Sequence, residues 1–432
     1  MLNLYRRVEN YIHLETGKPI SHHLIIEKSK NRETLLSHPN LFLSYSCNNS
    51  IQTSNRYSSV ITKFYTFLST LDKFKGKDLS EYHVLASNID IKRWQIHRQI
   101  ERVKSQSVKP TSKSIYEDAQ ALLVFFNWLN ESGYPTCVQV KKKQWKANFR
   151  NDSLLNYISK KAKVSIDAKN VTVLDKESRQ KKNKTLISQN EINWFRESFN
   201  DPVYDAIFML CLGTAMRPID LCRFPYIGTG SNSHIMPYSD MDQSTKTIEY
   251  HVSNSKGGKS RDIVINIKDL ERLENNYINK HFYERKEKYT KRYGKECPPH
   301  ILFLNKFGKP VTPTMVSSRG SDAKNLAIKN HPEFREGTTF YDARDWWPTM
   351  FMIRTFKEKL LTEETNVLYL AVAEVVMQQM GHEDIATTYK HYIDMAKLIV
   401  IAHKGQVNEL VKESFDAVSC VEKYDSVLHE VF

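Results

Sequence analysis

A tyrosine near the carboxyl end of the chain carries the most specific chemical signal. Tyr392 follows His382 by ten positions, in a segment that begins Met380-Gly-His. A tyrosine hydroxyl with a pKa near ~10 is only about 0.1 % ionised at neutral pH, so its use as a nucleophile requires roughly 4 kcal/mol of help from its surroundings. We therefore expect fixed positive charges close to this tyrosine.

Three basic side chains elsewhere in the chain are candidates for that charge. Arg217 directly precedes a proline, and Lys256 lies in the glycine-containing segment Ser255–Arg261. Arg344 precedes two tryptophans. An arginine can hold a phosphodiester through planar, charge-assisted hydrogen bonds, each worth roughly 1.5–3 kcal/mol. Two arginines are thus comparable with the free energy that the tyrosine lacks, and the pattern indicates phosphoryl transfer on DNA without a metal ion.

The order of these segments resembles that of the tyrosine recombinase (phage integrase) family over about residues 50 to 400. The family pattern is an arginine box, a hairpin lysine, a His-x-x-Arg box, a Gly-His box and then the tyrosine. The resemblance implies a 3′-phosphotyrosine intermediate, double-stranded DNA as partner, no cofactor, no metal, and a homotetramer on two DNA sites. It implies catalytic roles for Arg217, Lys256, Tyr341, Arg344, His382 and Tyr392.

Three features depart from the family pattern. Tyr341 stands where histidine is usual, Asp220 replaces the commoner glutamate, and the interval from Arg344 to His382 is long. Tyr341 would either donate a hydrogen bond to the phosphate or pack against the domain. Outside the family pattern, the ordinary interpretation of Arg217 is a structural ion pair with Asp220.

Two of the assignments have a close neighbour as competitor. Tyr389 and Tyr392 lie three residues apart, on nearly the same face of one helix. The family places the tyrosine nine or ten positions after the Gly-His histidine, so Tyr392 fits this spacing and Tyr389 does not. Lys256 and Lys259 flank the same two glycines, and either could protonate the departing 5′ oxygen. Lys256 aligns better with the family's lysine.

Composition indicates a polyanionic partner. The 432 residues include 63 basic and 49 acidic side chains, a net charge of +14 with a pI near 9.2. No apolar run approaches the roughly 20 residues of a membrane span, and the amino terminus has no signal core. We expect a cytoplasmic protein without membrane contact. Six cysteines without zinc spacing are interpreted as reduced core thiols: Cys47, Cys137, Cys211, Cys222, Cys297 and Cys420.

The predicted fold is mainly α with a small β-hairpin (α+β), arranged as a two-domain DNA clamp with a helical core-binding domain and a catalytic domain. Apolar residues at helical spacing from Thr53 to Leu71 and from Ile115 to Leu129, with a further helix near Asn88, predict the first domain. The expected divisions are an N-terminal extension of unknown role (1–50), the core-binding domain (51–140), a basic linker (141–184), the catalytic domain (185–410) and a tail exchanged between protomers (411–432).

Local signals predict the elements that position the candidate residues. Ser188 opens a capping box, and Asp201 followed by proline begins an apolar helix. This helix must end near Arg217, because the residue before a proline is pushed out of helical geometry. Alternating runs at 247–252 and 261–267, joined by the basic glycine-containing segment, predict a β-hairpin.

Three other functions remain compatible with parts of this pattern. A type IB topoisomerase would share the residues and chemistry but reseal the same strand. A non-catalytic DNA-binding protein would retain the fold with a decayed site. A metal-dependent phosphoesterase is disfavoured because the sequence shows no carboxylates at metal-ligand spacing.

Overall fold

The computed structural model confirms a mainly α-helical protein with small antiparallel sheets. It contains two compact units, one of residues 1–145 and 163–183 and the other of residues 146–162 and 184–432. The residues that the structure describes are 3–12, 14, 17, 19–29, 32–48, 50–143, 165–173, 175, 186–356, 367–382, 392 and 396.

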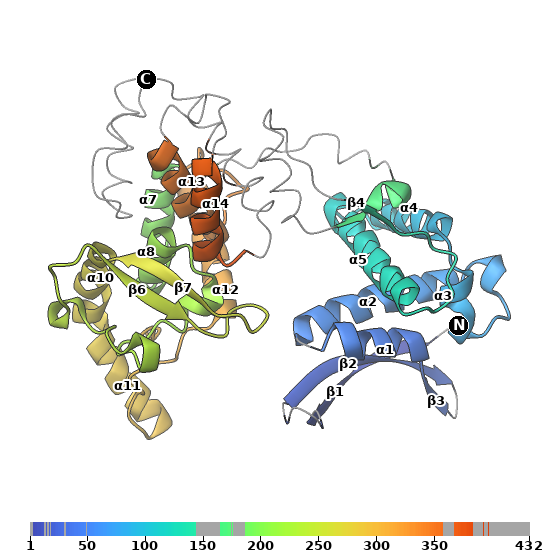
Figure 1. Cartoon of the computed structure of the whole chain (residues 1–432), viewed down its shortest axis with the longest axis horizontal. Coiled ribbons are helices and arrows are strands. Elements are labelled where there is room, and N and C mark those ends of the chain that lie inside the picture. Colours follow the sequence, from blue (N-terminus) through green and yellow to red (C-terminus); the bar gives the residue numbers. More distant parts are fainter. Residues whose placement is uncertain are drawn as a thin grey trace. The chain divides into compact units, whose positions relative to one another are not determined.

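The first unit combines a three-stranded sheet with a helical bundle (Figure 1). The sheet has the order β1-β2-β3, and a short β4–β5 pair joins the two chain segments of the unit. In chain order the elements are β1 (Leu4–Ile12), β2 (Pro19–Ser29), β3 (Arg32–Leu35), α1 (Ser37–Ser46), α2 (Ile51–Leu68), η1 (Asp72–Phe74), η2 (Leu79–Glu81), α3 (Tyr82–Leu85), α4 (Asn88–Lys104), α5 (Ser112–Glu131), β4 (Lys141–Lys143), β5 (Ser165–Asp167) and η3 (Ala168–Val171).

The three N-terminal strands fall in the segment 1–50, which the sequence analysis described as an extension of unknown role. β1 and β2 pair from Leu4 opposite Glu27 to Ile12 opposite Pro19. The Asn40 side chain of α1 accepts a hydrogen bond from the Ile25 amide at 2.7 Å and donates one to the Ile25 carbonyl at 2.9 Å. This side chain therefore links the sheet to the helical bundle. β2 also packs against α2.

The helices predicted for this unit are confirmed as α2, α4 and α5. α2 begins where the Ser50 side chain accepts the amide of Thr53, and α4 begins with a capping box formed by Ser87 and Asp90. Their apolar faces bury one hydrophobic core, which includes Phe64, Trp94, Leu122 and Phe126. The spacing of the apolar residues thus specified this bundle.

The second unit contains the candidate catalytic residues. In chain order its elements are α7 (Gln189–Glu197), α8 (Pro202–Thr214), α9 (Pro218–Leu221), η5 (Gly230–Asn232), η6 (Tyr238–Asp240), β6 (Thr247–Val252), β7 (Arg261–Asn266), α10 (Ile267–Leu273), the π-helical turn η7 (Glu274–Phe282), α11 (Tyr283–Tyr293), α12 (Pro313–Asn330), η8 (Phe340–Asp342), α13 (Ala343–Phe356) and α14 (Val367–Met380).

The local signals of this unit are also confirmed. Ser188 and Glu191 form the capping box of α7, and Asp201 caps α8 with proline as the first helical residue. β6 and β7 form the predicted hairpin, with Thr247 opposite Asn266. Within the unit, α13 packs against α8 and α14, and α14 packs against β7. Figure 1 shows α13 and α14 beside α8 with the hairpin next to them.

One cysteine departs from the predicted core thiols. Cys47, Cys211 and Cys297 are buried, whereas Cys137 is exposed. Cys137 lies in the connection after α5, where its backbone amide donates a hydrogen bond to the carbonyl of Val84. Among the described helices, none is both long and apolar enough to cross a membrane.

Candidate active site

Arg217 stands between two helices and aims its side chain at the end of a third. α8 ends at Thr214, where Ala215 adopts a left-handed backbone conformation with φ of 55°. Arg217 then has extended backbone (φ −72°, ψ 153°) immediately before Pro218, as the proline predicts. Its guanidinium donates hydrogen bonds to the Gly381 carbonyl at 2.8 Å and to the Ser255 hydroxyl at 3.2 Å.

Arg344 approaches the same helix end from α13. It is buried, with 3 % of its surface exposed. Its Nε donates to the Ala215 carbonyl at 2.7 Å, Nη1 donates to the Tyr341 hydroxyl at 2.7 Å, and Nη2 donates to the Met380 carbonyl. The two arginines, far apart in the sequence, therefore converge on consecutive carbonyls at the carboxyl end of α14.

Tyr341 lies on the solvent side of this cluster. Its side chain is 47 % exposed, and its hydroxyl accepts the hydrogen bond from Arg344. The arginine also lies over the tyrosine ring, 5.7 Å from its centroid. A hydroxyl that accepts from a cation keeps its own proton available for another acceptor. The geometry is therefore compatible with the first of the two roles expected for Tyr341, as a donor to a phosphate.

Glycine at position 381 is required by the approach of the arginines. Gly381 has a φ of +64°, and a Cβ added to it would lie 3.0 Å from Nη1 of Arg217 and 3.0 Å from Cδ of Arg261. A left-handed conformation is unfavourable for other residues by roughly 1–2 kcal/mol. The glycine of the Gly-His pair thus serves both the turn after α14 and the packing of two guanidinium groups.

Gly381→Ala is expected to lower the free energy of unfolding and also to disturb the arginines. Gly294 provides a matched control, because its φ is +65° and a Cβ there meets nothing within 4 Å. Both alanine variants should lose roughly 1–2 kcal/mol of stability from the backbone alone. Gly381→Ala should additionally lose the DNA cleavage that the sequence motifs predict, measured as adduct formation. Equal cleavage by the two variants would contradict a role for this contact.

A third arginine, which the sequence analysis did not single out, completes the cluster. Arg261 of β7 forms an ion pair with Asp220 at 3.0 Å. The Ser255 hydroxyl lies between them, because it accepts a hydrogen bond from Arg261 and donates one to Asp220. Asp220 therefore pairs with Arg261, and the described contacts of Arg217 are with Ser255 and Gly381. The structural ion pair that we considered for Arg217 is thus formed by another arginine, which holds the hairpin against α9.

Like charges lie close together in this cluster. Burial, followed by the neighbouring guanidinium groups of Arg344 and Arg261, lowers the pKa of Arg217 to about 10. The side chain remains charged at neutral pH, so its repulsion from the other two arginines is offset in part by Asp220 and by helix-end carbonyls. A phosphate entering beside Arg217 and Arg344 would remove that repulsion.

Gln379 ties the hairpin to the helices that carry the arginines. Its side-chain amide donates to the carbonyls of Thr214 at 3.1 Å and Val264 at 3.0 Å, and its oxygen accepts from the Val264 amide at 3.0 Å. The side chain is buried, with 4 % exposed. α8, β7 and α14 are therefore linked by one residue directly before the arginine-binding carbonyls.

Lys256 lies at the tip of the β6–β7 hairpin. The turn is closed by hydrogen bonds from Ser255 to the Lys259 carbonyl at 2.8 Å and from Gly258 to the Ser255 carbonyl at 2.9 Å. Lys256 and Lys259 are both exposed. Lys256 directly follows Ser255, whose hydroxyl is bonded to Arg217. The backbone of Lys256 therefore lies near the arginine cluster, while its side chain is exposed to solvent.

His382 and Tyr392 pack against each other near Arg344. The two rings stack with centroids 5.7 Å apart and an angle of 9° between their planes. Tyr392 is buried, with 4 % exposed, and its hydroxyl donates to Asp345 Oδ1 at 3.2 Å. Asp345 was not among the sequence candidates. Tyr389, the competing tyrosine, lies outside the described residues.

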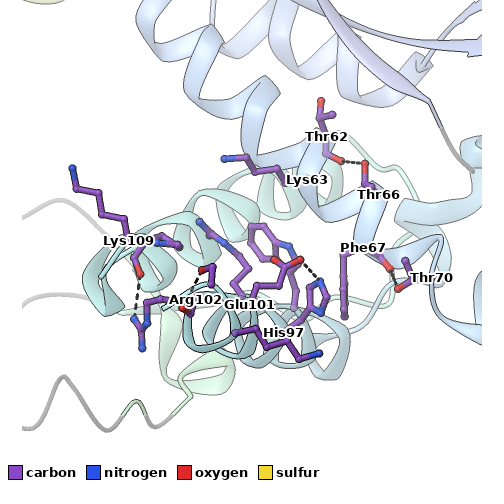
Figure 2. Close-up of a pocket in the computed structure, with 14 residues that line it drawn as sticks. Thr62, Lys63, Thr66, Phe67, Thr70, His97, Glu101, Arg102 and Lys109 are labelled. Carbon is purple, nitrogen blue, oxygen red and sulfur yellow. Dashed lines mark hydrogen bonds and ion pairs between the residues drawn. The ribbon is translucent and has the colours of Figure 1, made fainter. Parts of the chain in front are cut away.

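The first unit contains a basic hollow that the sequence analysis also missed. It has a volume of about 1010 Å³ and lies between α2, α4 and the connection after α4 (Figure 2). Phe67 and His97 face each other in it with ring centroids 5.1 Å apart. Its lining includes Lys63, Arg98, Arg102, Lys104 and Lys109. Arg98 and Arg102 are neutralised by ion pairs with Asp118 and Asp175, whereas the three lysines are exposed.

Within the described residues, no group of three or more His, Cys, Asp or Glu side chains is placed to hold a metal ion. The cluster that we describe consists of arginines, hydroxyl groups, helix-end carbonyls and the carboxylate of Asp220.

Solved structures that resemble the chain include integrases and a site-specific recombinase. A lambda integrase dimer bound to a COC′ core site is 13% identical, with a TM-score of 0.43 over 82% of this chain and 92% of that one. XerH recombinase bound to a palindromic difH substrate is 14% identical, with a TM-score of 0.46 over 82% and 79%. The Tn1549 transposon integrase in complex with circular intermediate DNA is 15% identical, with a TM-score of 0.45 over 85% and 98%. No protein-family model and no curated protein sequence matches the chain.

Proposed function

We propose that this protein is a tyrosine-type site-specific DNA recombinase, which cuts and rejoins DNA strands for the integration or excision of a mobile element. The observation that carries the proposal is the convergence of Arg217, Arg344, His382 and Tyr392 at the carboxyl end of α14. These residues were selected from the order of sequence motifs alone. Their proximity supports the proposal that these motifs form one site.

The charges at this site suit phosphodiester chemistry. Each charge-assisted hydrogen bond from an arginine is worth roughly 1.5–3 kcal/mol, and a neutral tyrosine lacks roughly 4 kcal/mol as a nucleophile at pH 7. Arg217 and Arg344 hold helix-end carbonyl oxygens in the DNA-free chain. Phosphate oxygens would take the place of these carbonyls and gain stronger bonds, because they carry a full negative charge.

In the proposed reaction the Tyr392 hydroxyl loses its proton to water, its oxygen attacks the scissile phosphorus and the bond to the 5′ oxygen breaks. The products are a 3′-phosphotyrosine and a 5′-hydroxyl, whose proton comes from Lys256. Tyr341 donates a hydrogen bond to a phosphate oxygen. A 5′-hydroxyl of a partner strand then reverses the step, so the phosphodiester energy is conserved in the covalent intermediate.

Double-stranded DNA is the proposed partner of both units. The net charge is +14, and the exposed lysines of the hollow between α2 and α4 are placed to neutralise phosphates. Each neutralised phosphate contributes roughly −0.9 to the slope of log affinity against log salt. We propose a homotetramer on two DNA sites. Residues 144–164, 174 and 176–184 of the basic linker, and the tail at 411–432 for which we expected exchange between protomers, lie outside the described residues.

The proposal is tested by covalent trapping. The protein is incubated with a DNA library, denatured, and the protein-linked DNA is sequenced. Recovery of one sequence motif at the linkage would support site-specific recombination. Linkage without sequence preference, together with relaxation of supercoils, would favour a topoisomerase. Binding without any linkage would favour a non-catalytic DNA-binding protein.

Lys256→Ala is expected to slow cleavage of an ordinary phosphodiester far more than cleavage of a substrate with a bridging 5′ sulfur. A thiolate leaves readily without protonation, whereas an alkoxide does not. The measurement compares single-turnover adduct formation on both substrates, with Lys259→Ala as the matched control on the same turn. Rescue by sulfur in Lys259→Ala alone would transfer the role to Lys259.

A further inference from the structure

The hydroxyl of Tyr392 faces a carboxylate in the DNA-free chain. Tyr392 Oη donates to Asp345 Oδ1 at 3.2 Å, and the two residues are 4 % and 8 % exposed. Asp345 directly follows Arg344 at the start of α13. A hydrogen bond sheltered from water in this way is stronger than one at the surface. The phenol therefore serves as a donor and must carry its proton.

The groups around Tyr392 come from three elements. Asp345 and Arg344 lie on α13, Tyr341 lies on η8, and His382 follows α14 and stacks on the Tyr392 ring. Burial and then the charge of Asp345 raise the pKa of Tyr392 above its ordinary value, while Arg344 acts in the opposite direction. The result is a phenol that is harder to ionise than a free tyrosine, which is the reverse of what a nucleophile needs.

The cation next to this phenol is directed elsewhere. The three described hydrogen bonds of the Arg344 guanidinium go to the carbonyls of Ala215 and Met380 and to the Tyr341 hydroxyl. The nucleophile and its activating arginine thus each have other partners. This arrangement describes a resting state.

We propose that Asp345 is a positioning residue that holds Tyr392 as a buried, neutral phenol until DNA occupies the arginine cluster. The proposal rests on the proposed function in so far as Tyr392 is the nucleophile. A phosphate bound by Arg344 would bring a negative charge towards Asp345, the next residue in the chain, and like charges that lie close together repel. Binding of DNA therefore weakens the contact between Asp345 and Tyr392 and releases the hydroxyl.

The hydrogen bond is tested first without DNA. Full-length protein containing 3-fluorotyrosine is titrated by fluorine NMR, and the Tyr392 signal is assigned from its loss in Tyr392→Phe. Asp345→Asn keeps the shape of the side chain and removes its charge. We expect Tyr392 to titrate about one unit lower in this variant. Glu284→Gln, which removes a carboxylate from the exposed surface of α11, should leave the signal unchanged.

Single-turnover cleavage provides the second measurement. Asp345→Asn should form the adduct up to about tenfold faster near neutral pH, because a one-unit lower pKa gives tenfold more phenolate. An unchanged titration of Tyr392 would overturn the proposal. Loss of cleavage with normal DNA binding would also overturn it, since Asp345 would then be needed in the reaction itself. If the titration shifts but the wild type forms no adduct on any DNA, the proposed function fails while the role of Asp345 stands.

Discussion

Tyr392→Phe is expected to abolish the covalent protein–DNA adduct while leaving DNA affinity nearly unchanged. The substitution removes one hydroxyl, and the hydrogen bond that this hydroxyl makes in the DNA-free chain is to Asp345, within the protein. The ring can keep its stacking on His382, so the fold around α14 should persist. Affinity depends instead on basic side chains spread over both units. The measurement is denaturing electrophoresis of labelled DNA after incubation with each protein.

Tyr389→Phe is the matched control for this prediction, because it removes the same hydroxyl from the neighbouring tyrosine. This variant should still form the adduct. Peptide mapping of the wild-type adduct should find the modification on Tyr392. A DNA-linked peptide modified on Tyr389 would reverse the assignment, and adduct formation by Tyr392→Phe would exclude Tyr392 as the nucleophile.

The parts of the fold that the sequence predicted are those specified by local chemistry. The capping box at Ser188, the proline after Asp201 and the proline after Arg217 each act within a few residues, and each has the predicted effect. The hairpin of β6 and β7 is also local, because alternation and a glycine-containing turn suffice to specify it. These elements place Arg217 and Lys256, so their positions followed from the sequence.

The contacts that the sequence did not predict join distant segments. Asp220 and Arg261 are 41 residues apart in the chain, and Asp345 and Tyr392 are 47 apart. No periodicity or turn signal relates such positions, because their proximity arises only when α8, α13, α14 and the hairpin have packed. A weaker signal existed for Arg261, since it follows a candidate lysine on a strand that must pack against the helices. For Asp345, position directly after Arg344 was the available signal.

The N-terminal strands were missed for a different physical reason. β1 contains Arg6, Arg7 and Glu9 among its apolar residues, and much of it is exposed. A strand that is mostly exposed on both faces shows little alternation of apolar and polar residues, so its sequence does not predict a strand. Its structure depends on pairing with β2, where Ile25 is buried and bonded to Asn40.

Arg344→Ala and Arg217→Ala should each reduce cleavage by about 10²- to 10³-fold, the effect typical of removing a donor aimed at a developing negative charge. DNA affinity should fall only modestly, since each variant removes one positive charge of many. Single-turnover adduct formation and a binding assay at fixed salt separate the two effects. Arg292→Ala is the matched control, because it also removes one positive charge, but from the exposed surface of α11. This variant should cleave DNA normally.

Arg344→Lys distinguishes charge from geometry at the same position. Lysine keeps the positive charge but has no planar fork, so it cannot bond to Ala215, Met380 and Tyr341 in the directions that the arginine does. We therefore expect its cleavage to remain close to that of Arg344→Ala.

Because Arg344 is buried, the unfolding transition of each variant must also be measured. Arg217 is half-buried, so we expect its replacement to destabilise the fold less. Near-normal cleavage by a folded Arg217→Ala protein would remove that arginine from the site, and near-normal cleavage by Arg344→Lys would reduce the role of Arg344 to charge alone.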